Sequence, residues 1–333
     1  MRKATPLAAL GLASAVMLTA CASGAAEGGS SAEPEPSTAT LGIFTAPTVL
    51  QAGLAWGLFD DLPMEMTVID SGPAALPLVK RGDMAGIVDL SATPLMVGET
   101  SEIPLKIVWM TSGATYDLVV SPDITSAEDL VGKNIAIVPG SILEYVLDKY
   151  LEEHGVDPAT VKKVDLPPPS MPAALSTGQI DGAFVWEPFS SQMVESGGTS
   201  IAEDSDRGLV VFGADYVEQY PENVQAVVCS VAASAERFLE DPDAAYEAIG
   251  EQLGQPAEGI AAAMPSASVL EPSQANADDL GDGTSPSKYA ADIAAIGDWL
   301  ASQDRIPYAP TVEDVENLFD PSFAIAVDEG ACE

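Results

Sequence analysis

The spacing of apolar residues near the start of the body predicts strands and helices in alternation. Residues 40–45 are expected to form a strand that ends at Ala46-Pro47, and an apolar helical stretch follows from Val49 to Phe59. Met64 to Ile69 is expected to form a second strand. Gly72-Pro73 opens the next helix, because proline is tolerated in the first helical turn.

The same order continues through the next segment. Residues 80–83, Lys-Arg-Gly-Asp, end that helix, Gly86 to Leu90 forms a third strand, and residues 91–94, Ser-Ala-Thr-Pro, open another helix. Alternating strands and helices call for a mainly parallel sheet with helices on its faces. The sequence therefore predicts an α/β fold.

A second set of elements follows, with its own turn residues. Strands are expected at 103–110, 117–121, 134–138 and 182–185, and a short capped helical turn is expected at 125–130. The chain thus carries a second group of strands that can build a second sheet.

One helix of this second set has a clear start and end. Ser141 with Glu144 three residues later matches a capping box, in which the serine oxygen accepts from a helix amide and the glutamate returns to the N–H of the cap. The helix is expected to run from Ile142 to about His154 and to stop at Gly155.

A weak internal repeat links the two sets. Residues 73–76, Pro-Ala-Ala-Leu, and the glycine-bounded stretch at 82–86 recur as residues 172–175 and 178–182, with a spacing that differs slightly. Both copies are interpreted as a helix, a glycine turn and a strand. The period is too long for a solenoid, so the repeat indicates two similar half-domains that share a cleft.

The last third is expected to be mostly helical. Val224 to Val228 is interpreted as a short strand, and helices follow. Apolar residues recur at helical spacing within 287–303 and again within 312–319. These stripes are typical of helices that pack on a core.

The first residues resemble an export signal. Residues 1–20 combine a basic start with a short apolar segment, and Leu18-Thr19-Ala20-Cys21 resembles the lipobox of bacterial lipoproteins, in which the cysteine is lipidated. An ordinary secretory signal with a chance cysteine is the alternative. Residues 22–37 lack large apolar side chains and are expected to form a flexible linker. We expect a protein held at the outer face of the cell membrane by the lipid on Cys21, since no later apolar run is long enough to cross a bilayer.

Charge restricts the partners. The chain has 13 Lys and Arg residues against 51 Asp and Glu residues, a formal net charge of −38. Such a surface repels nucleic acid, so nucleic-acid binding is excluded. Few cations are available to clamp a multiply charged anion, so an anionic ligand is expected to be bound by neutral dipoles.

The remaining cysteines and the single histidine limit the chemistry. Cys229 and Cys332 are an even pair in an oxidising compartment, which indicates a disulfide. His154, at a predicted helix end, is interpreted as a partner of the helix dipole. One histidine and the absence of a Gly-x-Ser-x-Gly motif argue against a hydrolase, and no ligand-like spacing of acids indicates a metal site. We expect no enzyme activity, metal or cofactor.

Several segments in order carry a family resemblance. They are the lipobox, Asp70-Ser71-Gly72, the Ser-Ala-Thr-Pro of 91–94, the Glu-Asp-Leu-Val-Gly-Lys of 128–133, and the Gly-x-x-Asp-Gly turn of 178–182 followed by Trp186-Glu187-Pro188. The chain from about Leu41 to Tyr308 resembles the solute-binding proteins of nitrate, sulfonate and taurine ABC importers, and it is most similar to the taurine-binding branch.

This resemblance implies a type II periplasmic-binding fold with two α/β lobes and a ligand cleft between them. Lobe one would comprise residues 38–118 and 224–333 and lobe two residues 119–223, with chain crossings near 116–121 and 214–224. The implied function is an extracytoplasmic receptor that captures a small taurine-like sulfonate or zwitterion and delivers it to an ABC permease. We expect a monomer.

Three strand-to-helix junctions are candidates for the anionic end of that ligand. Helix N-termini present free N–H groups and partial positive charge, and ligands of open α/β sheets lie beyond the carboxyl ends of the strands. Capping alone would also explain serine and threonine there. The candidate residues are Ser71, Gly72, Ser91, Ala92, Thr93, Ser141 and Ile142.

An amine would need other partners. Trp186 offers a π face and Glu187 a carboxylate at the end of the 182–185 strand, and Tyr116 and Thr45 are lesser candidates. The taurine-binding pattern has Trp-Ala-Pro at 186–188 and an acid in the strand that returns to lobe one, whereas this chain has Glu187 and reads Gln-Ala-Val-Val-Cys-Ser at 225–230. Alkanesulfonates, nitrate, other zwitterions and pyrimidine vitamin precursors stay open as ligands, and a surface lipoprotein without transport is the other class.

Overall fold

The computed structural model describes residues 39–264, 269, 279–281 and 286–332. The expected signal peptide, Cys21 and the linker lie outside these residues. Residues 38–333 form one compact unit. Among the described residues, no helix is both long and apolar enough to cross a membrane.

The first of two five-stranded sheets has the order β2-β1-β3-β10-β4. Its strands are β1 (Ala39–Ile43), β2 (Met64–Val68), β3 (Gly86–Leu90), β4 (Leu105–Thr111) and β10 (Gly208–Gly213). β1 pairs in parallel with β2 and β3, while β10 is antiparallel to both β3 and β4. The expected parallel sheet is therefore present, with one antiparallel strand inserted in it.

The second sheet repeats this plan with the order β7-β6-β8-β5-β9. Its strands are β5 (Thr115–Val120), β6 (Asn134–Ile137), β7 (Lys162–Asp165), β8 (Gly182–Val185) and β9 (Thr199–Ser205). β6 is parallel to β7 and β8, and β5 is antiparallel to both of its neighbours. In each sheet the antiparallel strand is the first one after the chain crosses from the other sheet.

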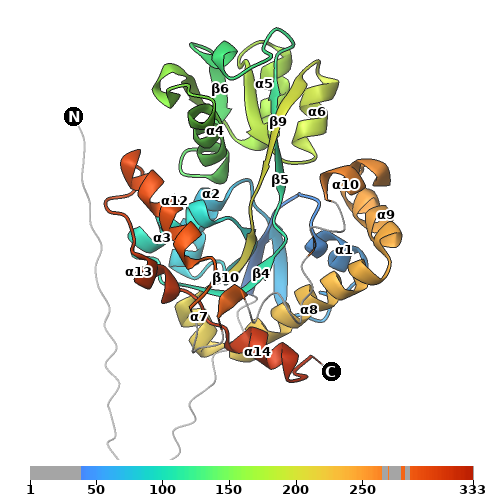
Figure 1. Cartoon of the computed structure of the whole chain (residues 1–333). Coiled ribbons are helices and arrows are strands. Elements are labelled where there is room, and N and C mark those ends of the chain that lie inside the picture. Colours follow the sequence, from blue (N-terminus) through green and yellow to red (C-terminus); the bar gives the residue numbers. More distant parts are fainter. Residues whose placement is uncertain (1–38, 265–268, 270–278, 282–285, 333) are drawn as a thin grey trace, which may run out of the picture. The chain divides into compact units, whose positions relative to one another are not determined.

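Helices flank both sheets (Figure 1). They are α1 (Val49–Ala55), α2 (Gly72–Arg81), α3 (Ala92–Thr100), α4 (Ile142–Glu153), α5 (Met171–Ser176), α6 (Phe189–Glu195), α7 (Ala214–Gln219), α8 (Pro221–Glu240), α9 (Pro242–Leu253), α10 (Ala257–Ala263), α12 (Ala290–Ser302), α13 (Val312–Glu316) and α14 (Ser322–Asp328), with 3₁₀ turns at η1 (Glu128–Leu130), η2 (Pro158–Thr160) and η3 (Pro168–Ser170).

The chain crosses between the sheets at residues 112–114 and returns at 206–207. We call the part built on the first sheet the first lobe (39–111 and the described residues of 208–332) and the part built on the second sheet the second lobe (115–205). The crossings expected at 116–121 and 214–224 are therefore misplaced. β5 lies wholly in the second sheet and β10 in the first, because each inserted strand begins directly after its crossing.

The strand expected at Val224–Val228 is wrong, because these residues lie inside the 20-residue helix α8. Val224, Val227, Val228 and Val231 are all fully buried, at the spacing of one helix face. β-branched residues favour strands only weakly, and packing of this face on the first lobe overrides that preference. Pro221 at the start of α8 is compatible with the helix.

The internal repeat corresponds to equivalent positions in the two sheets. Its two strands, β3 and β8, are each third in their sheet and lie next to the inserted strand. These strands begin at Gly86 and Gly182. A Cβ at Gly86 would lie 2.4 Å from Val211 O, and a Cβ at Gly182 would lie 2.8 Å from Val119 O. Glycine is required in both copies because the inserted strand passes this close.

Each lobe has its own apolar core. The first contains buried residues of β1, β3, β4, β10 and α8, and the second contains buried residues of β5, β6, β8 and α4. The expected disulfide between Cys229 and Cys332 is present. It fastens the end of the chain to α8, so the C-terminal segment belongs to the first lobe.

Candidate functional site

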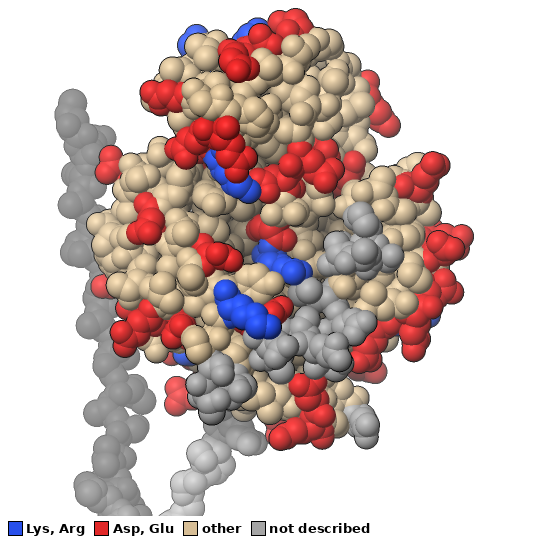
Figure 2. All heavy atoms as spheres, in the orientation of Figure 1, with Lys and Arg blue, Asp and Glu red and all other residues tan. Residues whose placement is uncertain are grey.

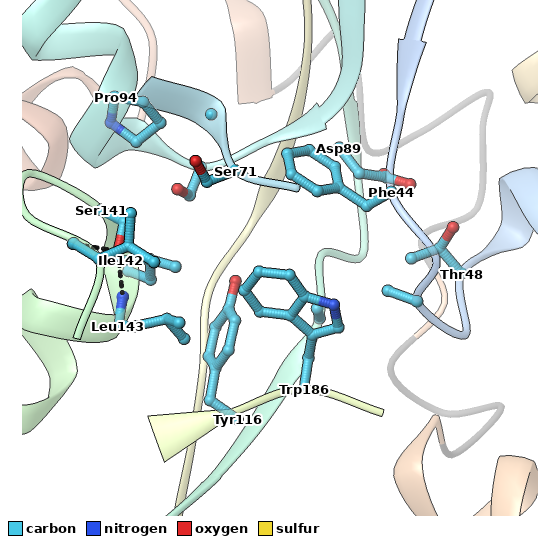
Figure 3. Close-up of a pocket in the computed structure, with 15 residues that line it drawn as sticks. Phe44, Thr48, Ser71, Asp89, Pro94, Tyr116, Ser141, Ile142, Leu143 and Trp186 are labelled. Carbon is cyan, nitrogen blue, oxygen red and sulfur yellow. Dashed lines mark hydrogen bonds between the residues drawn. The ribbon is translucent and has the colours of Figure 1, made fainter. Parts of the chain in front are cut away.

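A small pocket lies between the lobes, with a volume of about 40 Å³. Both lobes contribute to it, at the ends of strands and the starts of helices (Figure 3). It is lined by Phe44, Ala46, Thr48, Ser71, Gly72, Asp89, Ser91, Pro94, Ala114, Tyr116, Val138, Ser141, Ile142, Leu143 and Trp186. The space suits a solute of a few heavy atoms, since a single water needs roughly 10–15 Å³ by this measure.

Three helices begin at this pocket. Ser71, Ser91 and Ser141 occupy the N-cap positions of α2, α3 and α4, and all three line the cavity. Of the three, Ser141 also caps its helix with the side chain. The first amides of a helix have no partner within the helix, and the helix dipole adds partial positive charge there. This side of the pocket therefore favours an anionic group.

The start of α4 differs from the expected capping box. Ser141 Oγ accepts from Leu143 N at 3.2 Å and donates to Val138 O at 2.7 Å. Glu144 accepts from Gly140 N at 3.0 Å, not from the N–H of Ser141. Since the hydroxyl of Ser141 is occupied, the amide of Ile142 is the group left to contact a ligand here.

An aromatic wall closes one side of the pocket. The ring of Trp186 makes edge-to-face contacts with Phe44 and Tyr116, at centroid distances of 6.0 Å and 6.4 Å. Trp186 Nε1 is buried and has no hydrogen-bond partner within the described part of the chain. An indole N–H in this position is available to an acceptor on a ligand.

Asp89 brings a carboxylate to the pocket that the sequence pattern did not reveal. It accepts a hydrogen bond from the hydroxyl of Thr111, and its φ of 62° is left-handed. Burial raises the pKa of its carboxyl, and hydrogen bonds from Thr111 and Thr48 only partly offset this effect. A non-glycine residue held in this backbone region is a common mark of a functional site. Inside a predicted strand, Asp89 carried no signal that would set it apart.

A second acid lies directly behind the pocket. Tyr116 Oη donates to Asp206 Oδ1 at 2.8 Å, while the buried Asp206 Oδ2 has no hydrogen-bond partner among the described residues. Burial raises the pKa of Asp206 to about 7, and the charge of Asp89 adds to the shift. Asp206 lies at the crossing that leads back to the first lobe. The expectation that this chain lacks an acid there was wrong, because 225–230 is part of α8.

The expected site residues divide into two groups. Those that line the pocket are Ser71, Gly72, Ser91, Tyr116, Ser141, Ile142 and Trp186. Those that do not are Thr45, Ala92, Thr93 and Glu187. Ala92 lines a neighbouring cavity and Thr93 is fully buried. Glu187 instead accepts hydrogen bonds from Ser191 and Gln255.

The other reactive side chains of the described structure lie elsewhere. His154 caps the end of α4, where Nδ1 lies 2.7 Å from Tyr150 O, in agreement with the expected dipole partner. Within the described ranges, no cluster of three His, Cys, Asp or Glu residues could hold a metal ion. The pocket itself offers helix N-termini to an anionic group and the carboxyl of Asp89 to a cationic group.

Two α/β lobes with a pocket between the ends of their strands define the periplasmic-binding class of folds. A family model, the NMT1-like family, matches residues 33–250. The chain belongs to this family.

Known proteins agree with this assignment. The taurine-binding periplasmic protein of Escherichia coli K12 is 31% identical over 185 residues, which is 52% of this chain and 57% of that protein. The match thus spans little more than half the length of that relative. The alkanesulfonate-binding protein of Xanthomonas axonopodis pv. citri, solved with bound MOPS, has a TM-score of 0.70 at 19% identity, over 85% of this chain and 99% of that one. The nitrate-binding protein of Synechocystis PCC 6803 has a TM-score of 0.66 at 15% identity, over 87% and 88%. At these identities the solved structures establish the fold.

Proposed function

We propose that this protein is an extracytoplasmic receptor of an ABC importer that captures a small, taurine-like zwitterion between its lobes. The observation that carries the proposal is the polarity of the pocket. In Figure 3, Ser141 and Leu143 at the start of α4 lie on one side, and Asp89 and Thr48 lie on the other. One end suits an anion and the other suits a cation.

The anionic end is expected to carry a single charge. No Lys or Arg is among the described residues that line the pocket, so the negative group depends on amides at the starts of α2, α3 and α4 and on the hydroxyls of Ser71 and Ser91. A sulfonate can accept several such hydrogen bonds while adding one charge. A phosphate ester adds a second charge that nothing in this lining neutralises.

The cationic end is assigned to Asp89, with Asp206 behind it through Tyr116. A buried carboxylate without a cation is costly, and an ammonium group would remove that cost. Trp186 offers its π system to the same group. Glu187, the acid expected for this role, has other partners, so Asp89 replaces it in the proposal.

Other solutes fit less well. Nitrate and alkanesulfonates have no cation for Asp89, and a pyrimidine has no full negative charge for the helix starts. The match to a taurine-binding protein supports the zwitterion over these alternatives.

The setting follows from the same proposal. The signal-like start and Cys21 support export and a lipid anchor on the outer face of the membrane, and the acidic surface agrees with a monomer that docks on a permease. Figure 2 shows acidic side chains scattered over one face of the molecule, with few basic ones. We propose no catalytic step, because no histidine or lysine is among the described residues that line the pocket beside its serines.

The test is calorimetry of the full chain with two matched solutes, taurine and ethanesulfonate, which differ only in the ammonium group. Taurine is expected to bind more than tenfold tighter, since one charged hydrogen bond contributes about 1.5–3 kcal/mol. Nitrate, a pyrimidine and a phosphate ester serve as further solutes. Equal affinity for taurine and ethanesulfonate would contradict a zwitterionic ligand. Failure to bind any of the five solutes would contradict the receptor function.

A further inference from the structure

Within the described residues, two side-chain hydrogen bonds join the lobes outside the pocket, in addition to an edge-to-face contact between Tyr145 on α4 and Trp299 on α12. Arg305 Nη2 donates to Glu144 Oε1 at 2.5 Å, and Gln255 Nε2 donates to Glu187 Oε2 at 3.0 Å. Glu144 lies in α4 and Arg305 follows α12, while Gln255 precedes α10 and Glu187 precedes α6. Figure 1 shows α4 and α12 on one side of β5 and β9, and α6 and α10 on the other. The lobes are therefore held together on both sides of the strands that connect them.

The partners of the Arg305–Glu144 contact are anchored in different cores. Leu300 and Ile306, on either side of Arg305, are buried in the first core, and Leu143, next to Glu144, is buried in the second. Neither anchor can move far without disturbing a packed core. A relative motion of the two lobes is thus the simplest way to break this contact.

Glu144 also binds the loop that lines the pocket. Its Oε2 accepts from Gly140 N at 3.0 Å, and the next three residues, 141–143, all line the cavity. The second contact has the same feature, since Glu187 follows Trp186 of the aromatic wall. Each of the two hydrogen bonds between the lobes involves a glutamate that directly follows a residue of the pocket lining.

Glu144 has a cationic partner besides Arg305. The side chain is completely buried, and Lys163 Nζ lies 3.1 Å from the same oxygen, on β7 of the same lobe. Burial raises the pKa of this carboxyl, but hydrogen bonds from Arg305, Gly140 and Lys163 outweigh burial, so the pKa is lower than usual. Lys163 Nζ also lies 2.8 Å from Oδ2 of Asp148, a second buried carboxylate, so without Arg305 this one lysine serves both acids. Glu144 thus keeps a cationic partner when its contact with Arg305 breaks.

We propose that Arg305 sets the ligand affinity without touching the ligand, by holding the first lobe on Glu144 while Glu144 holds the Gly140 loop in its binding arrangement. Gln255 and Glu187 form a weaker counterpart on the other side. The inference rests on the proposed receptor function. An interaction made only when the lobes are together stabilises that state, and its loss lowers the affinity for a ligand that needs the same state by at most the same factor.

The test compares Arg305→Gln with the unchanged protein by calorimetry and stopped-flow kinetics with taurine. Loss of one charge-assisted hydrogen bond is expected to raise the Kd about tenfold, mainly through faster dissociation. Arg305→Lys should recover part of the affinity, because it keeps the charge. Gln255→Ala removes a hydrogen bond to the same kind of carboxylate and should raise the Kd about threefold.

Lys149→Gln is the matched control. Lys149 also extends from α4, but its ion pair with Asp204 at 2.9 Å lies within the second lobe. Its loss should change the Kd less than twofold. Unchanged dissociation in Arg305→Gln, or equal weakening in Lys149→Gln, would overturn the proposal.

A second measurement separates this inference from the receptor function. Val68 and Val194 are exposed on the first and second lobes, and spin labels at V68C and V194C, in a chain carrying Cys21→Ser, report the distance between the lobes. Without any solute, Arg305→Gln should widen and lengthen this distance distribution. An unchanged distribution would refute the role of Arg305 even if no solute binds, while failure of the unchanged protein to bind any solute would refute only the receptor.

Discussion

Replacement of Asp89 by asparagine tests the charge pattern of the pocket most directly. Asparagine has nearly the same shape, and its oxygen can still accept from the hydroxyl of Thr111 that now binds Asp89. The change therefore removes one negative charge and little else. Any effect on binding can be attributed to that charge.

The expected loss follows from the contact that an ammonium group would make. A hydrogen bond between two charged groups contributes about 1.5–3 kcal/mol net, and each 1.4 kcal/mol is tenfold in Kd. Asp89→Asn should therefore raise the Kd for taurine by about 10- to 100-fold. Ethanesulfonate has no ammonium group, so its affinity should hold or improve when a nearby carboxylate is removed.

Calorimetry with both solutes, together with thermal melting of the free protein, provides the assay. Because burial raises the pKa of Asp89, its charged form costs stability at neutral pH, and the asparagine variant should melt at the same temperature or higher. A lower melting temperature with equal losses for both solutes would indicate damage to the fold. Unchanged taurine binding would refute the assignment of the cationic end to Asp89.

Three further predictions address the second acid, the helix starts and the repeat. The pKa of Asp206 is raised to about 7 from 3.8, so the folded chain holds this proton more tightly than the unfolded chain, and ionisation of Asp206 costs stability as pH rises from about 4 to 7. Asp206→Asn should therefore raise the melting temperature at pH 8 but not at pH 4. Identical melting curves of the variant and the unchanged protein at both pH values would refute the shift. Ile142→Pro removes one backbone N–H at a position where a helix accepts proline. It should weaken taurine binding about tenfold, whereas Ile142→Val should not. Unchanged affinity of Ile142→Pro for taurine would show that this amide does not contact the ligand. Gly86→Ala places a Cβ 2.4 Å from Val211 O and should lower the free energy of unfolding by about 1–3 kcal/mol, measured by urea unfolding. Gly213→Ala is the control, because its Cβ meets no atom closer than 3.5 Å, and it should lower the free energy of unfolding less.

The elements between residues 39 and 153 followed the sequence closely, because their apolar spacing and their turn residues agree, whereas β7, α6 and β9 were not predicted. The starts of α2, α3 and α4 at Gly72, Ala92 and Ile142 were all expected. Serine, proline and glycine mark these boundaries through backbone geometry, which is a local property. Local signals of this kind are readable without the fold.

What failed depends on contacts between distant segments. The valines of 224–228 are compatible with a strand or a buried helix face, and only packing against the first lobe decides between them. Misplacing that strand also moved the second crossing and hid Asp206. Asp89 and Glu187 show the same limit, since an acid at a strand end carries no mark of whether it faces a pocket or the other lobe.

The position of β10 between β3 and β4 has a consequence for how the chain matures. β3 and β4 are not neighbours, so until residue 213 is available the first sheet has a gap with two open inner edges. The entire second lobe lies between β4 and β10 in the sequence. A fragment that ends within the second lobe could complete the second sheet but not the first, so the first sheet becomes whole only after the entire second lobe has been synthesised.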